Sequence, residues 1–384
     1  MWIGACTSQI GTQMQVLAQA WMVLQISNNA ALLGLDSFLA TIPIVLFSLV
    51  GGVLADRTER QKLLLGSQIV QMICAFVLAI LFFTGVVRIW EILTLSFIVG
   101  TAQSFGGPAY SALIPSLVKP PDLPNAIALN SIQFNLARVI GPMLGALALA
   151  IGAAWCFTLN GISFIAVIIT LLIIRPHFVP TNSGHSVLKS MGQGFQFIRQ
   201  QGTMEALIVL AFSMTLLAFP LIVVLPVFAR NVFQGDANLL SRLLVSLGIG
   251  SICGALIVAG LGKYKHQGRY ALLMLVALGF LITGFALSPY RWLSYLLLFL
   301  AGGMLLAVFT TISSLVQMIT ADDMRGRVMS VYNVAFRGGT PFGSLIVGAL
   351  VSRFSAPKVV ACNGVLLALL GLYFLLVQRK IATL

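Results

Sequence analysis

Three ionisable side chains interrupt long apolar stretches of a sequence in which only 8% of the residues are charged: Asp36, Arg138 and Arg337. A charge in hydrocarbon costs about 2.5–3.5 kcal/mol or more on insertion scales, so such residues face a cavity or a partner. An acid in that place is suited to carrying a proton, because removal from water favours its uncharged form. An arginine there can bind an anionic group through its planar guanidinium.

Asp36 lies about one turn from the outer end of the second apolar stretch. It is the candidate for proton coupling, because the other acids lie at the ends of the apolar stretches or between them. The alternative is a water-exposed acid in an outer vestibule, paired with Arg242 or Arg353.

Arg138 and Arg337 recur in the same local pattern, Ser-x6-Arg-x3-Pro, which begins at Ser131 and again at Ser330. One role for each arginine is the binding of an anionic or phenolic substrate. The other is a hydrogen bond between helices, to backbone carbonyls or to Asn130, Asn135 and Asn333. The sequence leaves both roles open.

The apolar stretches that hold these residues must be membrane-spanning helices. The chain is 59% hydrophobic with a mean hydropathy of +1.03, which no soluble domain could cover with polar surface. A spanning helix needs about 20 apolar residues, whereas a barrel strand alternates over about 10. The pattern therefore predicts an all-α integral membrane protein with spans at 2–26, 32–54, 64–86, 91–113, 127–150, 156–174, 204–226, 239–261, 270–288, 293–316, 328–351 and 358–377.

The basic residues predict the orientation of these spans. If both termini are cytoplasmic, the inner segments hold 14 of the 22 Lys and Arg residues: Arg57, Arg60, Lys62, Lys119, Arg175, Lys189, Arg199, Lys263, Lys265, Arg269, Arg325, Arg327, Arg379 and Lys380. Such a bias is typical of cytoplasmic loops. It also explains the net charge of +13 without nucleic acid as a partner.

The chain divides into two pseudo-symmetric bundles of six helices, predicted at 1–174 and 204–384. The two arginine patterns fall in the fifth and eleventh spans, as a duplication requires, and parallel repeats are typical of transporters. The linker at 175–203 contains an apolar face of Leu188, Met191, Phe195 and Ile198. We interpret it as an amphipathic helix on the inner membrane surface; a solvated linker is the alternative.

Three motifs resemble the major facilitator superfamily over essentially the whole chain. The loop Gly52-x3-Asp56-Arg57-x2-Arg60-x-Lys62 resembles its signature loop, although Glu59 stands where glycine is usual. Asn130, Arg138, Gly141, Pro142 and Gly145 resemble the Gly-Pro motif of its antiporters. The segment from Asp322 to Ser330 resembles the branch that includes enterobactin and macrolide exporters.

The resemblance implies a cytoplasmic latch between the halves, in which Asp56 faces the start of the eleventh span near Arg325 and Arg327. An anion near a helix N-terminus gains roughly 0.3–1 kcal/mol. Gly52 and Arg57 belong to the same loop, and Arg60 is expected to pair with Asp122. Solvated charges that only fix topology are the alternative, because exposed ion pairs contribute little.

The resemblance also implies a central cavity lined by spans 1, 4, 7 and 10. A mixture of amides, hydroxyls and aromatic rings suits a bulky amphipathic ligand. The cavity candidates, which include the two arginines, are Gln9, Gln13, Gln103, Phe105, Arg138, Phe212, Thr311 and Arg337.

The sequence thus predicts a monomeric carrier of the bacterial inner (plasma) membrane that exports a drug-like compound or siderophore, with protons as the coupling ion. Many drug antiporters of the superfamily that this chain resembles carry an arginine in span four and an acid in span one. Both are missing here, which keeps uptake or exchange of an organic nutrient as an alternative. A membrane enzyme that modifies lipids is disfavoured, because no span holds His and no acids pair within a helix. We expect no catalytic site, cofactor or metal, since the five cysteines are scattered and the three histidines lack ligand spacing.

Overall fold

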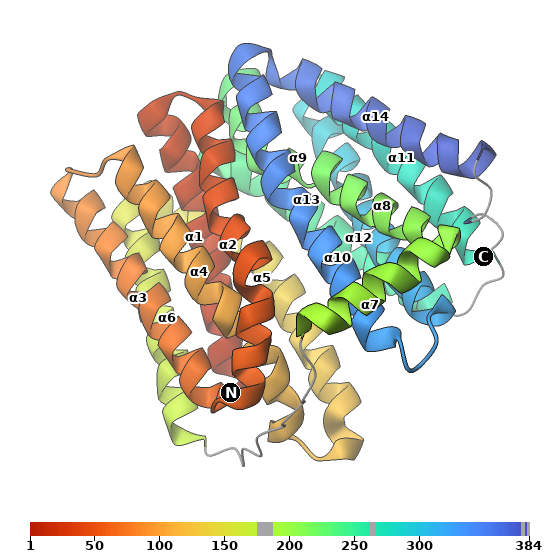
Figure 1. Cartoon of the computed structure of the whole chain (residues 1–384). Helices are drawn as coiled ribbons and strands as arrows, with labels where there is room; N and C mark the ends of the chain where they lie inside the picture. Colours follow the sequence, from red (N-terminus) through yellow and green to blue (C-terminus); the bar gives the residue numbers. More distant parts are fainter. Residues whose placement is uncertain (175–186, 262–265, 378–380, 382–384) are drawn as a thin grey trace. The chain divides into compact units, whose positions relative to one another are not determined.

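The computed structural model describes residues 1–174, 187–261, 266–377 and 381, and within these ranges it contains helices and no strands (Figure 1). The side chains of Leu49, Asp56, Leu261 and residues 187–191 also lie outside the description. The chain forms two compact units, one of residues 1–184 and 236–245 and the other of residues 185–235 and 246–384.

The first unit contains the first six long helices. They are α1 (Trp2–Ser27), α2 (Ala30–Arg57), α3 (Arg60–Thr84), α4 (Ile89–Leu113), α5 (Leu123–Ile151) and α6 (Ala153–Ile173), with short 3-10 turns at Ile114–Leu117 and Pro120–Asp122. The turn from α1 to α2 is tight because Asn28 adopts a left-handed conformation and the Asn29 side chain accepts from the Ala31 amide at 2.9 Å. Helix α1 packs on α5 and α6, and α4 packs on α2 and α3.

The second unit repeats this arrangement. Its helices are α7 (Val187–Gln200), α8 (Gly202–Leu217), α9 (Pro220–Val227) with a π-helical turn at Phe228–Val232, α10 (Ala237–Leu261, whose first turns belong to the first unit), α11 (Gln267–Leu287), α12 (Arg291–Ile319), α13 (Arg325–Arg353) and α14 (Ala356–Leu376). Helix α8 packs on α13 as α1 packs on α5, and α11 packs on α14 as α3 packs on α6.

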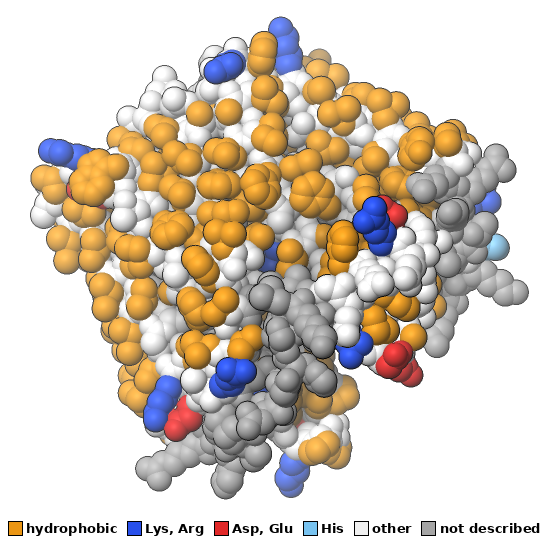
Figure 2. Space-filling model, in the orientation of Figure 1, with side chains coloured by type: hydrophobic (Ala, Val, Ile, Leu, Met, Phe, Trp, Pro, Cys, Tyr) orange, Lys and Arg blue, Asp and Glu red, His pale blue; other side chains and the backbone are white. Residues whose placement is uncertain are grey.

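Ten segments of the described chain are long and apolar enough to cross a membrane. Helices α1 and α4 are of spanning length, but the amides of α1 and the hydroxyls and Gln103 of α4 make them more polar. Large hydrophobic side chains such as Phe83, Leu147 and Phe280 stay exposed, and Figure 2 shows hydrophobic side chains spread over the visible face. Lipid must solvate this surface, because water would not.

The seventh predicted span, 204–226, is interrupted at a proline. Helix α8 ends at Leu217 and α9 begins at Pro220. Proline has no amide hydrogen for the preceding turn, so it interrupts the ladder at this point. The Phe233 amide then donates to the Phe228 carbonyl at 2.9 Å and closes the π-helical turn.

Helix α7 lies in the predicted linker and is amphipathic, but the described side chains of the expected apolar face differ in burial. Ile198 is buried, but Phe195 is 58% exposed, and the side chains of Leu188 and Met191 lie outside the described residues. A Cβ at Gly194 would lie 2.7 Å from the Arg327 carbonyl oxygen, so α7 lies directly against α13. The buried face of α7 therefore includes Gly194 and Ile198, one turn apart, and it packs on protein.

Candidate functional site

Asp36 lies at the meeting point of three helices in the first unit. Its side chain is only 9% exposed, which contradicts the alternative of a water-exposed acid. The Gln19 amide of α1 donates to both carboxylate oxygens, at 3.0 and 2.9 Å, and the Ser96 hydroxyl of α4 donates to Oδ1. Gln19 also donates to the Ser96 oxygen at 2.8 Å, so the three side chains form one connected network.

Small residues bring the helices close enough for this network. A Cβ at Gly100 would lie 2.4 Å from the Ala40 carbonyl oxygen, so α4 and α2 touch at their backbones. Gly100 is one turn from Ser96, and Ala40 is one turn from Asp36, so the same crossing places the hydroxyl at the carboxylate. A second close contact follows at Gly51, where a Cβ would lie 2.4 Å from the Ser104 carbonyl oxygen.

The network suits reversible proton binding. Among the described residues, the donors to Asp36 are a neutral amide and a neutral hydroxyl, and neither locks the carboxylate in an ion pair. A rotatable hydroxyl can also accept a hydrogen bond from a protonated acid. Because the donors come from α1 and α4, a relative shift of these helices would change the number of bonds to the carboxylate and so its proton affinity.

The Gly-Pro segment of α5 packs on α1. Cβ atoms at Gly141 and Gly145 would lie 2.4 Å from Cβ of Gln13 and 3.0 Å from the Met14 carbonyl oxygen, so the two backbones are in direct contact. In α13 the glycines Gly339 and Gly343 touch α8 in the same manner, at the Phe212 and Leu216 carbonyls. The two patterns therefore provide equivalent close packing in the two units.

The two arginines of these patterns keep accessible side chains, although protein atoms surround most of each one. In the described part of the chain neither guanidinium has a hydrogen-bond partner, and Asn130 instead accepts from the Tyr110 hydroxyl at 3.1 Å. Pro142 and Pro341 also leave the carbonyls of Arg138 and Arg337 without the usual helical donor. This exposure favours contact with a ligand over a structural bridge, and the role stays a prediction.

The other cavity candidates differ in accessibility. Gln103 is exposed, Gln9, Gln13, Phe105 and Phe212 are half-buried, and Thr311 is buried. The Thr311 hydroxyl donates to the Ala307 carbonyl of its own helix at 2.8 Å. Thr310 and Ser314 of the same helix line a pocket instead; successive helical positions differ by about 100° in direction, so Thr310 and Thr311 point to different sides.

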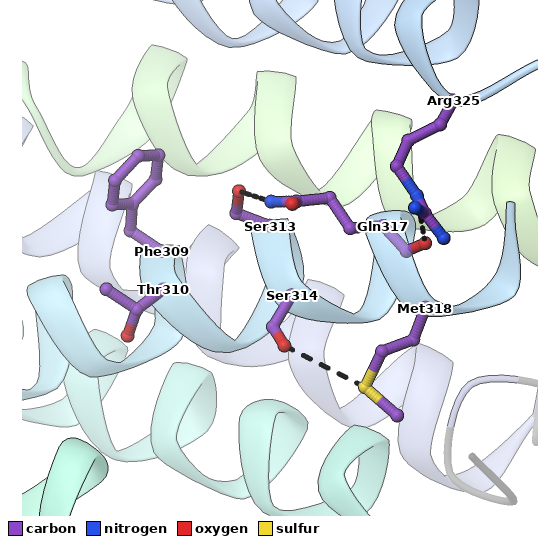
Figure 3. A pocket seen from close by; sticks show the side chains of 7 residues that line it. All are labelled: Phe309, Thr310, Ser313, Ser314, Gln317, Met318 and Arg325. Carbon is purple, nitrogen blue, oxygen red and sulfur yellow. Dashed lines mark hydrogen bonds between the residues drawn. The ribbon is translucent and has the colours of Figure 1, made fainter. Parts of the chain in front are cut away.

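That pocket lies in the second unit and has a volume of about 420 Å³. Figure 3 shows its lining, in which α12 contributes all residues except Arg325 of α13: Phe309, Thr310, Ser313, Ser314, Gln317, Met318 and Arg325. Sequence reasoning missed Phe309, Ser313, Gln317 and Met318. The polar row at positions 313 and 317, four residues apart, was the available signal.

The latch residues give a mixed result. The side chain of Asp56 lies outside the described residues, so its contact with α13 stays a prediction. Arg325 pairs with Asp322 at 2.6 Å and donates to the Gln317 carbonyl at 3.3 Å. The Arg327 guanidinium lies 3.2 Å from the Met324 sulfur.

The expected pairing of Arg60 with Asp122 is wrong for the described chain. Arg60 donates to the Ala55 carbonyl at 3.3 Å and to the Ala112 carbonyl at 3.0 Å, whereas Asp122 is exposed. Carbonyls in the last turn of a helix lack intrahelical donors, so they are favourable acceptors for a nearby guanidinium. Gly52 and Arg57, which were expected in a loop, lie in α2 instead; Gly52 has open space around it, and Arg57 is exposed.

Comparison with known proteins gives one family and one fold. The sequence model of the transmembrane secretion effector family (MFS_3) matches residues 1–382. The enterobactin exporter EntS of Shigella boydii serotype 18 is 30% identical over 337 residues, which are 86% of this chain and 79% of that protein.

Solved structures are similar in fold at much lower identity. A bacterial homologue of the human lysosomal transporter Spinster, in an inward-facing and occupied conformation, has a TM-score of 0.79 at 13% identity, with 99% of this chain and 96% of that chain covered. The nucleoside transporter NupG has a TM-score of 0.69 at 15% identity, with coverages of 97% and 98%.

Proposed function

Because the chain belongs to the transmembrane secretion effector family of the major facilitator superfamily, we propose that it exports an amphipathic small molecule by alternating access, driven by protons. The chain is a multi-pass membrane transporter rather than an enzyme. The proposed location is the bacterial inner membrane, with both termini cytoplasmic, as the basic residues indicate.

The single observation that carries the proton coupling is the buried Asp36 network. A carboxylate in a spanning helix, held by neutral donors from two other helices, is an arrangement that proton-coupled carriers can use. The donors are on α1 and α4, so the hydrogen bonds to the acid depend on how these helices are set. Protonation of Asp36 and movement of α1 and α4 are then linked, because protonation changes the relative stability of the two helix arrangements and the arrangement changes the proton affinity.

The proposed substrate is a siderophore or a drug-like compound. Similarity to an exporter of enterobactin over most of both chains supports an outward direction and a bulky organic substrate. The exposed Gln103, Arg138 and Arg337 would supply polar contacts, and the half-buried Phe105 and Phe212 would supply apolar ones.

The test replaces Asp36 with Asn in protein reconstituted into liposomes. We expect Asp36→Asn to lose substrate accumulation driven by a proton gradient, while substrate-for-substrate exchange continues, because exchange needs no net proton transfer. Asp236→Asn is the matched control, since Asp236 is an exposed acid whose replacement keeps the same shape. Gradient-driven accumulation that persists in Asp36→Asn would remove this residue as the proton carrier.

A further inference from the structure

The pocket on α12 has two parallel rows of side chains. Phe309, Ser313 and Gln317 form one row and Thr310, Ser314 and Met318 the other, each with four-residue spacing. Figure 3 shows Arg325 at the Gln317 end, with Phe309 and Thr310 at the other end. The pocket therefore has a cationic end and an aromatic end, joined by hydroxyl and amide groups.

The polar groups of the pocket are only weakly engaged. Gln317 Nε2 donates to Ser313 Oγ at 3.4 Å, and Ser314 Oγ donates to the Met318 sulfur at 3.8 Å. Both distances are long for hydrogen bonds, so these groups can exchange their partners for a ligand at small cost.

A buried hydroxyl, that of Tyr332, lies beside the pocket. Tyr332 is 1% exposed. The neighbouring polar side chain is Ser313, which lines the pocket. Because Ser313 lies close to this hydroxyl, a ligand that rotates Ser313 also changes the surroundings of Tyr332.

The charge of the pocket is positive. Arg325 is the charged residue among its described lining residues, and its partner Asp322 is 89% exposed. An ion pair so open to water contributes little. A ligand anion can therefore replace Asp322 and receive the two parallel hydrogen bonds that a guanidinium offers to a carboxylate.

We propose that this pocket binds an anionic aromatic solute, with its carboxylate or phenolate at Arg325 and Gln317 and its ring against Phe309 and Met318. Aromatic rings and thioethers favour contact with another ring, and the volume exceeds that of a single substituted ring. This inference rests on the proposed function, because it makes the pocket a binding site for the exported compound or for part of it.

Binding of 2-hydroxybenzoate to the purified full-length protein in detergent, measured by equilibrium dialysis, tests the proposal. The neutral 2-hydroxybenzamide is the matched probe. Arg325→Gln should weaken binding of the acid about tenfold, because one charge-assisted contact is lost, and should leave binding of the amide unchanged. Asp322→Asn should strengthen binding of the acid about threefold by freeing the guanidinium.

Arg269→Gln serves as a control, since Arg269 is an exposed cation of the same unit outside the pocket. Equal effects of Arg269→Gln and Arg325→Gln, equal affinity for acid and amide, or no binding at all would overturn the proposal. Displacement of the acid by phosphatidylglycerol, but not by phosphatidylcholine, would also overturn it, because the anion site would then hold a lipid phosphate.

This assay is independent of transport. If gradient-driven export fails while Arg325-dependent binding is observed, the proposed function falls and the binding site stands. If export occurs but binding does not depend on Arg325, only the binding site falls.

Discussion

At the scale of single residues, glycines position the functional side chains, because they let two helices come into backbone contact. Asp36 meets Ser96 because Gly100, one turn away, lets α4 touch the backbone of α2 at Ala40. The same pair of helices touches again at Gly51. A larger residue at either glycine would separate the helices and pull the donor from the carboxylate.

The adjacent glycines Gly51 and Gly52 near the end of α2 provide a direct comparison. A Cβ at Gly51 would lie 2.4 Å from the Ser104 carbonyl oxygen, whereas a Cβ at Gly52 would meet nothing within 4 Å. We expect Gly51→Ala to lower the free energy of unfolding by about 1–3 kcal/mol, because backbone atoms cannot yield to the methyl group. Gly52→Ala should be neutral or stabilising by up to about 1 kcal/mol, since alanine favours helix. Thermal unfolding of both variants in one detergent measures the difference, and equal melting temperatures would contradict it.

Sequence reasoning identified Asp36 but could not identify its environment. An acid within an apolar stretch is conspicuous, whereas its donors lie 17 and 60 residues away in sequence and depend on how three helices are rotated. The rotation of α12 was equally unknown from the sequence, so Thr311 was predicted as a cavity residue whereas Thr310 and Ser314 line the pocket. The expected partner of Arg60 failed for a related reason, because backbone carbonyls carry no signal in the sequence.

At the scale of elements, hydrophobicity predicted nearly every helix, because lipid leaves the backbone no other regular structure short of a closed barrel. The ends of the predicted spans differ from those of the helices by only a few residues, as α12 shows with 293–316 predicted and Arg291–Ile319 observed. The interruption at Pro220 follows from the proline itself, whereas the contact of α7 with α13 was not predictable, since it depends on tertiary packing.

The start of α10 depends on a side chain just outside the helix. Asp236 accepts from the Leu239 amide at 3.0 Å and from the Asn238 side chain at 2.9 Å. These two hydrogen bonds hold the pKa of the Asp236 carboxyl below its usual value, and the one from Asn238 has the larger effect. A lowered pKa means that this stabilisation is present at neutral pH and is lost as pH falls below about 4.

Replacement of this cap should therefore have a pH-dependent effect. Asp236→Ala should lower the free energy of unfolding at pH 7 by about 0.5–2 kcal/mol, toward the low end because the carboxyl is exposed. The difference from the unsubstituted protein should shrink at pH 3, where the carboxyl is protonated. Asp236→Asn should behave like the unsubstituted protein at pH 7, because asparagine also caps helices. A loss for Asp236→Ala that is equal at pH 7 and pH 3 would exclude this origin.

At the scale of the whole molecule, the two units repeat their packing but not their chemistry. Helices α1 and α5 pair through glycines as α8 and α13 do. The first unit holds the buried acid with its neutral donors, whereas the second holds the cationic pocket on α12. A duplicated scaffold would thus support the proposed proton site in one unit and the proposed ligand site in the other.

This division predicts that ligand affinity and proton coupling change independently. In liposomes, Asp36→Asn should lose gradient-driven accumulation while its affinity for 2-hydroxybenzoate stays unchanged. Arg325→Gln should lose about tenfold in affinity while the number of protons moved per substrate stays unchanged. Residues in separate sites without shared partners have additive effects, so the double variant should show the affinity of one single variant and the coupling of the other. Dialysis and a pH-sensitive dye inside the liposomes measure the two quantities, and an affinity that falls in Asp36→Asn would show that the acid also serves the ligand site.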